Sequence, residues 1–258
     1  MIKIFRNIRR KLLHEGKASN YLLYAIGEIA LVMIGILLAL QVNTWNQNRL
    51  DNITEVEYYK RFLDDVLLDE QLIANQVTQT EKRMNSANQL LASLQSGHSD
   101  MAKIATEIVN SVSRSDFSLT ATQTTYEDIK SSGSVHLIRD DEIKNQLDHY
   151  YAFMTALTNT INSNAARLAS RMLHKEDVIG TGLAHLASRQ GGIDSSVVNI
   201  TELKNLGRLT DENRLVLMND AVFYSAITSR NLQHLSALQE RVKDMKQILK
   251  AKCESSNE

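Results

Sequence analysis

The residue types that could carry chemistry are scattered along this chain rather than grouped in one motif. Seven histidines are present, and none has the H-E-x-x-H spacing or another spacing typical of metal ligands. His149, between Asp148 and Tyr150, is the most suggestive of them. A lone histidine near an apolar helix face is usually a packed or surface residue, so we expect neither metal binding nor catalysis from it. The full set is His14, His98, His136, His149, His174, His185 and His234.

No other catalytic pattern is present in the sequence. The segment Gly180-Thr181-Gly182 lacks the lysine of a phosphate-binding loop and is more typical of a flexible turn. A G-x-S-x-G nucleophile motif does not occur. Cys253 is the single cysteine, so it cannot form an internal disulfide and could at most link two chains. We therefore expect no catalytic residue, no metal site and no cofactor, which argues against an enzyme.

Two polar groups have both a structural and a functional interpretation. Asp64, Asp65, Asp69 and Glu70 form an acidic patch on a predicted helix, for which we prefer a solvated helix face over a cation site. The second group follows residue 125 and is expected to form a capped turn between helices, with its glycine in the left-handed conformation. The alternative is a polar contact spot for a ligand or partner. This second group is Tyr126, Glu127, Lys130, Ser131, Ser132 and Gly133.

The composition predicts an all-α protein. The chain of 258 residues has no proline, which suits long uninterrupted helices because proline breaks helix interiors. Hydrophobic residues make up 43% and charged residues 23%, values typical of a folded protein. Only five phenylalanines and one tryptophan are present, which argues against a large aromatic-rich β domain.

Residues 21–42 form an apolar span of 22 residues with one charge, Glu28. A helix of that length extends about 33 Å, enough to cross a hydrocarbon core of about 30 Å. A cleaved signal peptide would have a shorter apolar stretch followed by an A-x-A site, which is absent here. We therefore predict an uncleaved transmembrane helix in the lipid bilayer, with Trp45 at one interface and Tyr21 and Tyr24 at the other.

Basic residues gather in front of this span. Residues 1–20 carry a net charge of +5, the span −1 and residues 43–258 −5. This asymmetry predicts a cytoplasmic N-terminus and a main domain on the opposite side of the membrane. The main domain keeps no basic excess, so we expect no nucleic-acid binding. The leader is amphipathic, which suits a helix lying on the anionic leaflet or simply an orienting signal. Its basic residues are Lys3, Arg6, Arg9, Arg10, Lys11 and Lys17.

The span is not uniformly apolar, and its small and polar residues gather on one side. Glutamate is too short to extend to the headgroups as lysine does, so an acid within the span is expected to face protein or water. Gly35 and Ala39 form a small-xxx-small pair that permits close helix approach. We predict self-association or docking to another membrane protein, whereas the alternative is a protonated Glu28 with incidental glycines. The predicted contact face is Tyr24, Gly27, Glu28, Leu31, Gly35 and Ala39.

Beyond the span we predict a connector (43–54), an elongated helical bundle with long antiparallel helices (55–252) and a polar tail (253–258). The connector either continues the anchor helix or contains a soft break at residues 51–52. Residues 179–194 are glycine-rich and are expected to form a turn or loop. The predicted helices are 56–95, 100–112, 124–130, 140–174 and 211–252. Ile104 and Ile108 are expected on one side of the second of these.

Apolar residues at heptad-like spacing mark the expected buried sides of the two longest helices. In the first, polar residues at positions 70 and 80 interrupt the stripe. Thr210 or Asp211 is expected to cap the last helix. The first stripe is Tyr59, Leu63, Val66, Ile73, Val77, Met84, Ala87, Leu91 and Leu94, and the last is Leu215, Met218, Val222, Ala226, Leu232, Leu235, Leu238, Val242, Met245, Ile248 and Leu249.

The run YAIGEIALVMIGILLALQVNTWN (24–46) resembles the opening of an uncharacterised family of single-pass bacterial membrane proteins, whose members read YAIGEI-x-LV-x-IGILIALQ-x-N-x-WN after a basic leader. TYEDIKSSG (125–133), followed by Leu137-Ile138 and Tyr150-Tyr151, is similar to a recurrent family element. The sequence departs from the family after the anchor, at residues 43–47. The resemblance implies a bacterial inner membrane and a periplasmic main domain, but no activity.

Two classes of function follow. The first is a membrane-tethered helical scaffold or accessory subunit acting through protein–protein and helix–helix contacts. The second is a sensor-like ligand-binding bundle, which would need a partner to carry a signal because only about 20 residues precede the span.

Overall fold

The computed structural model describes residues 18–97, 100–112, 118–173, 193–194, 196–199, 202 and 209–255. The basic leader, the Tyr21 and Tyr24 side chains and most of the glycine-rich segment 179–194 lie outside the described residues. The chain divides into two compact units, residues 1–55 and 56–258, and each is described by itself below.

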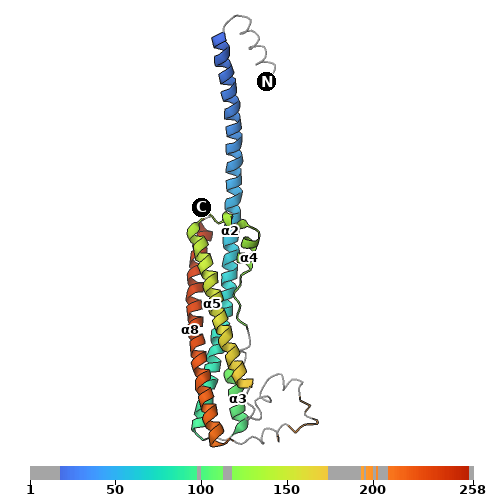
Figure 1. Cartoon of the computed structure of the whole chain (residues 1–258), viewed down its shortest axis with the longest axis vertical. Helices are drawn as coiled ribbons and strands as arrows, with labels where there is room; N and C mark the ends of the chain where they lie inside the picture. The colour runs from blue at the N-terminus through green and yellow to red at the C-terminus, as the bar shows by residue number, and fades with distance from the viewer. Residues whose placement is uncertain are drawn as a thin grey trace. The chain divides into compact units, whose positions relative to one another are not determined.

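The described part of the chain is helical throughout and contains no strand, which confirms the predicted all-α class. The longest helix, α2, contributes to both units. Helix lengths follow from the absence of proline and from the glycines near helix ends. The elements are α2 (Ala18–Gln95), α3 (Met101–Val112), α4 (Thr124–Ser131), the 3₁₀ turn η1 (Ser134–Leu137), α5 (Asp141–Leu173) and α8 (Asp211–Ser255) (Figure 1).

The first unit consists, as far as it is described, of the N-terminal part of α2. This helix is the one described element long and apolar enough to cross a membrane, and its most apolar window has a mean hydropathy of 2.3. The large apolar side chains from Ile26 to Val42 are 55–64% exposed. The helix is not interrupted at residues 51–52, so the connector continues it rather than breaking it.

The second unit packs α2, α5 and α8 side by side (Figure 1). Polar pairs fix the directions of these helices. Lys252 near the end of α8 meets Asp140 at the start of α5, and Asn231 meets Asn164 farther along. These two helices are therefore antiparallel. Lys246 contacts Glu70, whereas Arg214 donates to the Leu94 carbonyl oxygen, so α8 is also antiparallel to α2.

The buried stripe of α2 has a stricter heptad spacing than predicted. Leu63, Val77, Met84 and Leu91 are only partly buried, while polar residues occupy several interior positions. Leu63, Val77 and Leu91 still pack against the core clusters, so the predicted stripe is displaced to the edge of the buried face. The prediction followed apolar residues alone, and Thr80, treated as an interruption, is in fact buried. The buried stripe is Tyr59, Phe62, Val66, Asp69, Ile73, Thr80, Arg83, Ala87, Leu90 and Leu94.

In α8 the prediction is confirmed in the second half and wrong in the first. Leu235, Leu238, Val242, Met245 and Leu249 are buried as expected. Leu215, Val222 and Ala226 are exposed instead, because a different face of the helix packs inward. That face carries Leu217, Ala221, Tyr224, Thr228 and Asn231.

Among the described residues, two apolar clusters make up the core of this unit. The larger one joins α2, α5 and the C-terminal half of α8 with α4 and its flanking segments. The smaller one joins the end of α2 to α3, the end of α5 and the start of α8. Ile104 and Ile108, predicted on one side of α3, are both fully buried in this second cluster.

Side-chain caps explain where the helices begin. Asp140 accepts hydrogen bonds from the backbone N–H groups of Glu142 and Ile143 at the start of α5. The Thr210 hydroxyl accepts one from the N–H of Asn213 at the start of α8, so Thr210 caps that helix. After α4, Gly133 has a φ of +70°, as its sequence position predicted.

Candidate functional site

Two carboxylates of the acidic patch hold the segment before α4 against α2. Asp69 Oδ1 accepts a hydrogen bond from the backbone N–H of Thr122 at 2.7 Å, and Asp65 Oδ2 accepts one from Thr125 at 2.8 Å. Residues 118–123 are not helical, and Thr125 lies in the first turn of α4, so the N–H groups of Thr122 and Thr125 need acceptors from outside a helix. The expected solvated acidic face is therefore wrong for these two residues, which are 7% (Asp65) and 0% (Asp69) exposed. Asp64 is exposed, and Glu70 pairs with Lys246.

Asp69 also reaches α5. Its Oδ2 atom accepts a hydrogen bond from the Tyr150 hydroxyl at 2.8 Å. Burial raises the pKa of the Asp69 carboxyl, while the hydrogen bonds from Thr122 and Tyr150 oppose that rise. Burial and the neighbouring carboxylate raise the pKa of the Tyr150 hydroxyl, which keeps it protonated as the donor.

A tyrosine stack connects this buried network to the surface. The ring of Tyr126 on α4 stacks on that of Tyr151 at 4.3 Å between centroids, and Tyr151 meets Tyr150 edge to face at 5.1 Å. The Tyr126 hydroxyl donates to Asp148 Oδ1 at 2.5 Å and accepts from Lys130 Nζ at 3.3 Å. Lys130 Nζ also lies 4.6 Å from the centre of the Tyr126 ring. Burial and the bond to Asp148 raise the pKa of the Tyr126 hydroxyl.

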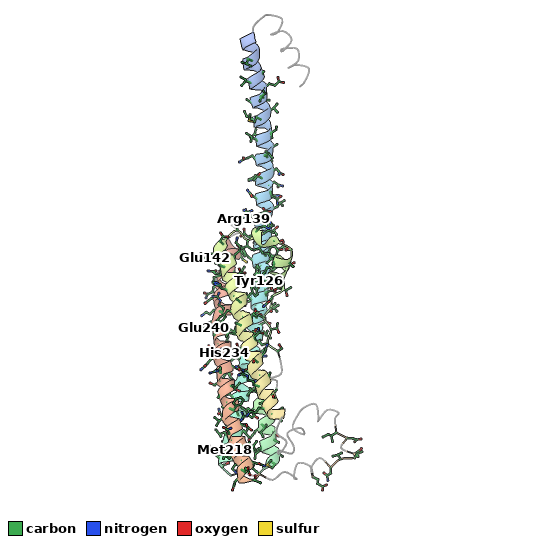
Figure 2. All side chains as sticks on the ribbon, viewed as in Figure 1. Tyr126, Arg139, Glu142, Met218, His234 and Glu240 are labelled. Carbon is green, nitrogen blue, oxygen red and sulfur yellow. The ribbon has the colours of Figure 1, made fainter. Side chains whose placement is uncertain are left out.

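A cavity of about 550 Å³ lies beside Tyr126, bounded by α4, η1, α5 and one residue of α2. We call it the α4–α5 cavity. Figure 2 labels Tyr126 near the end of the second unit where Arg139 and Glu142 also lie. The lining combines apolar and charged side chains: Phe62, Tyr126, Ile129, Lys130, Val135, Ile138, Asp141, Lys144, Asn145, Leu147 and Asp148.

Only part of the predicted polar spot takes part in this cavity. Tyr126 and Lys130 line it, whereas Glu127 is exposed and outside the lining. Residues 131–133 form the turn that ends α4, in which the Ser132 N–H donates to the Asp128 carbonyl oxygen and the Ser132 hydroxyl donates to Ser134. Ser131 bonds back to the same carbonyl oxygen of Asp128.

Helix α5 contributes the polar side of the cavity, which had not been predicted from the sequence. Asp141, Lys144, Asn145 and Asp148 follow the i, i+3, i+4, i+7 spacing that places them on one helix face. Because a helix over residues 140–174 was predicted, this spacing could have been used to predict a polar face on it. His149 is exposed and does not line the cavity. Within the described residues, no three His, Cys, Asp or Glu side chains are grouped so as to hold a metal ion.

A second, more open hollow of about 680 Å³ lies between α5 and α8. Arg171 Nε donates to Asp220 Oδ1 at 2.5 Å, and its guanidinium carbon lies 4.4 Å from the centre of the Phe223 ring. Asp220 is 1% exposed, and Arg171 provides the positive charge that its buried carboxylate needs. The arrangement is that of a packed ion pair between two helices.

The chain was also compared with known proteins. No protein-family model, curated protein or solved structure matches it.

Proposed function

We propose that the chain is a membrane-tethered helical scaffold or accessory subunit that acts through protein–protein and helix–helix contacts. The observation that carries this proposal is the exposed apolar N-terminal part of α2. Its large apolar side chains from Ile26 to Val42 are 55–64% exposed, and a cover of lipid or of another protein would remove them from water. The basic leader then orients the N-terminus to the cytoplasm, and the resemblance at the span favours a bacterial inner membrane with the second unit in the periplasm.

The contact would use the small-residue side of the span. A Cβ atom built on Gly27 or Gly35 meets nothing within 4 Å, so a second helix has room to approach either glycine. Glu28 lies on the same side, where a partner could supply a hydrogen bond to its carboxyl group. This supports self-association or docking to another membrane protein.

Topology is tested by cysteine labelling. In a Cys253→Ser background, single cysteines are placed at Ser229, which is exposed on α8, and at Ile2 in the leader. A membrane-impermeant maleimide added to intact spheroplasts should label the Ser229→Cys protein, and the Ile2→Cys protein only after lysis. The reverse pattern would overturn the proposed orientation.

The contact is tested by crosslinking and by pull-down with mass spectrometry from native membranes. Glu28→Leu and Gly35→Leu should reduce the crosslinked species or a stoichiometric partner. Leu37→Ala, on the opposite side of the helix, serves as the matched control and should leave both unchanged. Intact crosslinks and pull-down with Glu28→Leu would contradict the proposed contact face.

A second candidate function is a sensor-like ligand-binding domain that signals through a partner. The α4–α5 cavity supports it, because about 550 Å³ falls within the range of small-molecule sites, roughly 300–1,000 Å³. A small molecule that co-purifies with the protein would favour this candidate over the scaffold.

A further inference from the structure

We propose that the α4–α5 cavity binds a small zwitterion with an apolar body, the chemistry of a free apolar α-amino acid. This inference rests on the second candidate function above and names the class of its ligand. Three properties of the cavity support this ligand class. The cavity has an apolar wall, its described lining residues have no net charge, and its charged groups are joined by hydrogen bonds that a ligand can replace.

The apolar wall comes from residues that belong to the larger core cluster. Phe62, Ile129, Ile138 and Leu147 are each 1–3% exposed, and all four line the cavity. These side chains are held by the packing of α2, α4 and α5, so the wall is already formed before a ligand arrives. An apolar ligand body would gain free energy by leaving water at this wall.

The charges of the described residues that line the cavity are balanced. Lys130 and Lys144 contribute two positive charges, and Asp141 and Asp148 contribute two negative charges. A ligand with a single charge can pair with only one member of each oppositely charged pair. A zwitterion can replace both members of an ion pair at once and keeps the site neutral. Charge balance therefore favours a zwitterion over a simple anion, cation or metal ion.

The charged groups are linked by hydrogen bonds that a zwitterionic ligand can replace. Lys130 Nζ and Asp148 are linked through the Tyr126 hydroxyl, with donor–acceptor distances of 3.3 and 2.5 Å. A ligand carboxylate can bond to Lys130 while its ammonium bonds to Asp148, which leaves the Tyr126 hydroxyl able to bond to either.

A second pair stands nearby on α5. Lys144 Nζ lies 2.5 Å from Asp141 Oδ1, and the Lys144 side chain is 30% exposed while that of Asp141 is 86% exposed. The Asn145 side chain, with its amide donor and acceptor, completes the polar side. The cavity thus presents donors and acceptors at one side and aliphatic and aromatic carbon at the other.

The test measures binding to the full chain in lipid nanodiscs by isothermal titration calorimetry and by thermal unfolding. The probes are L-leucine and L-phenylalanine, together with N-acetyl-L-phenylalanine (no ammonium), L-phenylalaninamide (no carboxylate) and glycine (no apolar body). The two apolar amino acids should bind and raise the Tm with concentration, and the other three should bind at least about tenfold more weakly.

Variants locate the site. Lys130→Met and Asp148→Asn, both at exposed positions, should weaken phenylalanine binding about tenfold, while the circular dichroism of each free variant still shows a folded helical protein. Lys243→Met and Asp244→Asn are the matched controls, because both residues are exposed on α8 and lie outside the cavity lining. They should leave binding unchanged.

The contrary outcomes are distinguishable. If a probe lacking one charge binds as well as phenylalanine and the cavity variants weaken it, the zwitterion assignment is overturned while the ligand-binding function stands. If phenylalanine binds but is insensitive to the cavity variants, the site assignment is overturned. If none of the probes binds at millimolar concentration, the ligand class is overturned, and the absence of any co-purifying molecule would then remove the sensor function as well.

Discussion

The hydroxyl of Tyr150 on α5 donates a hydrogen bond to the carboxylate of Asp69 on α2 at 2.8 Å, between residues that are both fully buried. The other carboxylate oxygen of Asp69 accepts the backbone N–H of Thr122. One buried acid thereby joins two long helices and the segment that leads into α4. A polar group at a heptad core position fixes the register of helices, because any slip leaves it unsatisfied.

Removing the Tyr150 hydroxyl should therefore destabilise the second unit. Tyr150→Phe leaves one oxygen of the buried Asp69 carboxyl without its donor, and we expect a loss of about 1–3 kcal/mol in the free energy of unfolding. Chemical denaturation of the full chain in detergent, followed by circular dichroism, measures it. Tyr151→Phe is the control: its buried hydroxyl has no hydrogen-bond partner among the described residues, so its removal should cost nothing or stabilise. Equal losses for the two variants would contradict this account.

The buried pair between Asn164 and Asn231 predicts a non-additive response. Asn164 Nδ2 donates to Asn231 Oδ1 at 2.8 Å, and the residues are 5% and 4% exposed. Asn164→Leu or Asn231→Leu alone should cost about 1–3 kcal/mol, because the remaining amide loses its partner. The double variant should be close to the unchanged protein in stability, since no amide is then left unsatisfied. A double-mutant cycle measures this, and additive losses would argue against a direct pair.

The start of α5 should show an acid-dependent stability. The hydrogen bond from Lys252 and those from the backbone N–H groups lower the pKa of Asp140 below its ordinary value of 3.8. A lowered folded-state pKa stabilises the protein above the unfolded pKa, and this contribution is lost as the pH falls through the folded value. The stability difference between the unchanged protein and Asp140→Asn should therefore be constant above about pH 5 and shrink below pH 4.

Lys252→Met provides the check on this assignment. Because the Lys252 ammonium is the largest cause of the lowered pKa, Asp140→Asn should have a weaker pH dependence in that background. If the pH dependence is unchanged in the Lys252→Met background, the hydrogen bonds from the backbone N–H groups at the start of α5 alone would account for the lowered pKa of Asp140. Denaturation curves at several pH values measure both cases.

The turn after α4 should depend on the backbone freedom of Gly133. This residue has a φ of +70°, and a Cβ atom there would meet nothing within 4 Å, so conformation rather than space limits substitution. Gly133→Ala should cost about 1 kcal/mol, and Gly133→Asn less, because asparagine tolerates the left-handed region better. Thermal unfolding of the two variants compares them directly. A larger loss for asparagine than for alanine would indicate that space, not φ, is decisive.

The sequence by itself determined the helical class, most helix ends and the apolar span. The absence of proline and the positions of Asp140, Thr210 and Gly133 are local signals, and each acts within a few residues of where it stands. The boundaries of α3, α4, α5 and α8 were accordingly predicted to within three residues, whereas the predicted start at residue 56 was wrong because α2 continues without interruption from Ala18. The second half of α8 and the two isoleucines of α3 were also recognised, because there the buried positions are almost all apolar.

Only the tertiary structure decided which polar residues lie inside. Asp65 and Asp69 were predicted to be solvated because carboxylates are rarely buried. The neighbouring sequence does not indicate that the backbone N–H groups of Thr122 and Thr125 donate hydrogen bonds to them. The predicted buried face of α2 was displaced from the observed one for the same reason. Asp69, Thr80 and Arg83 occupy interior positions, and a pattern of apolar residues does not include them. The cavity likewise exists only where α4 and α5, distant in the sequence from Phe62, come together around it.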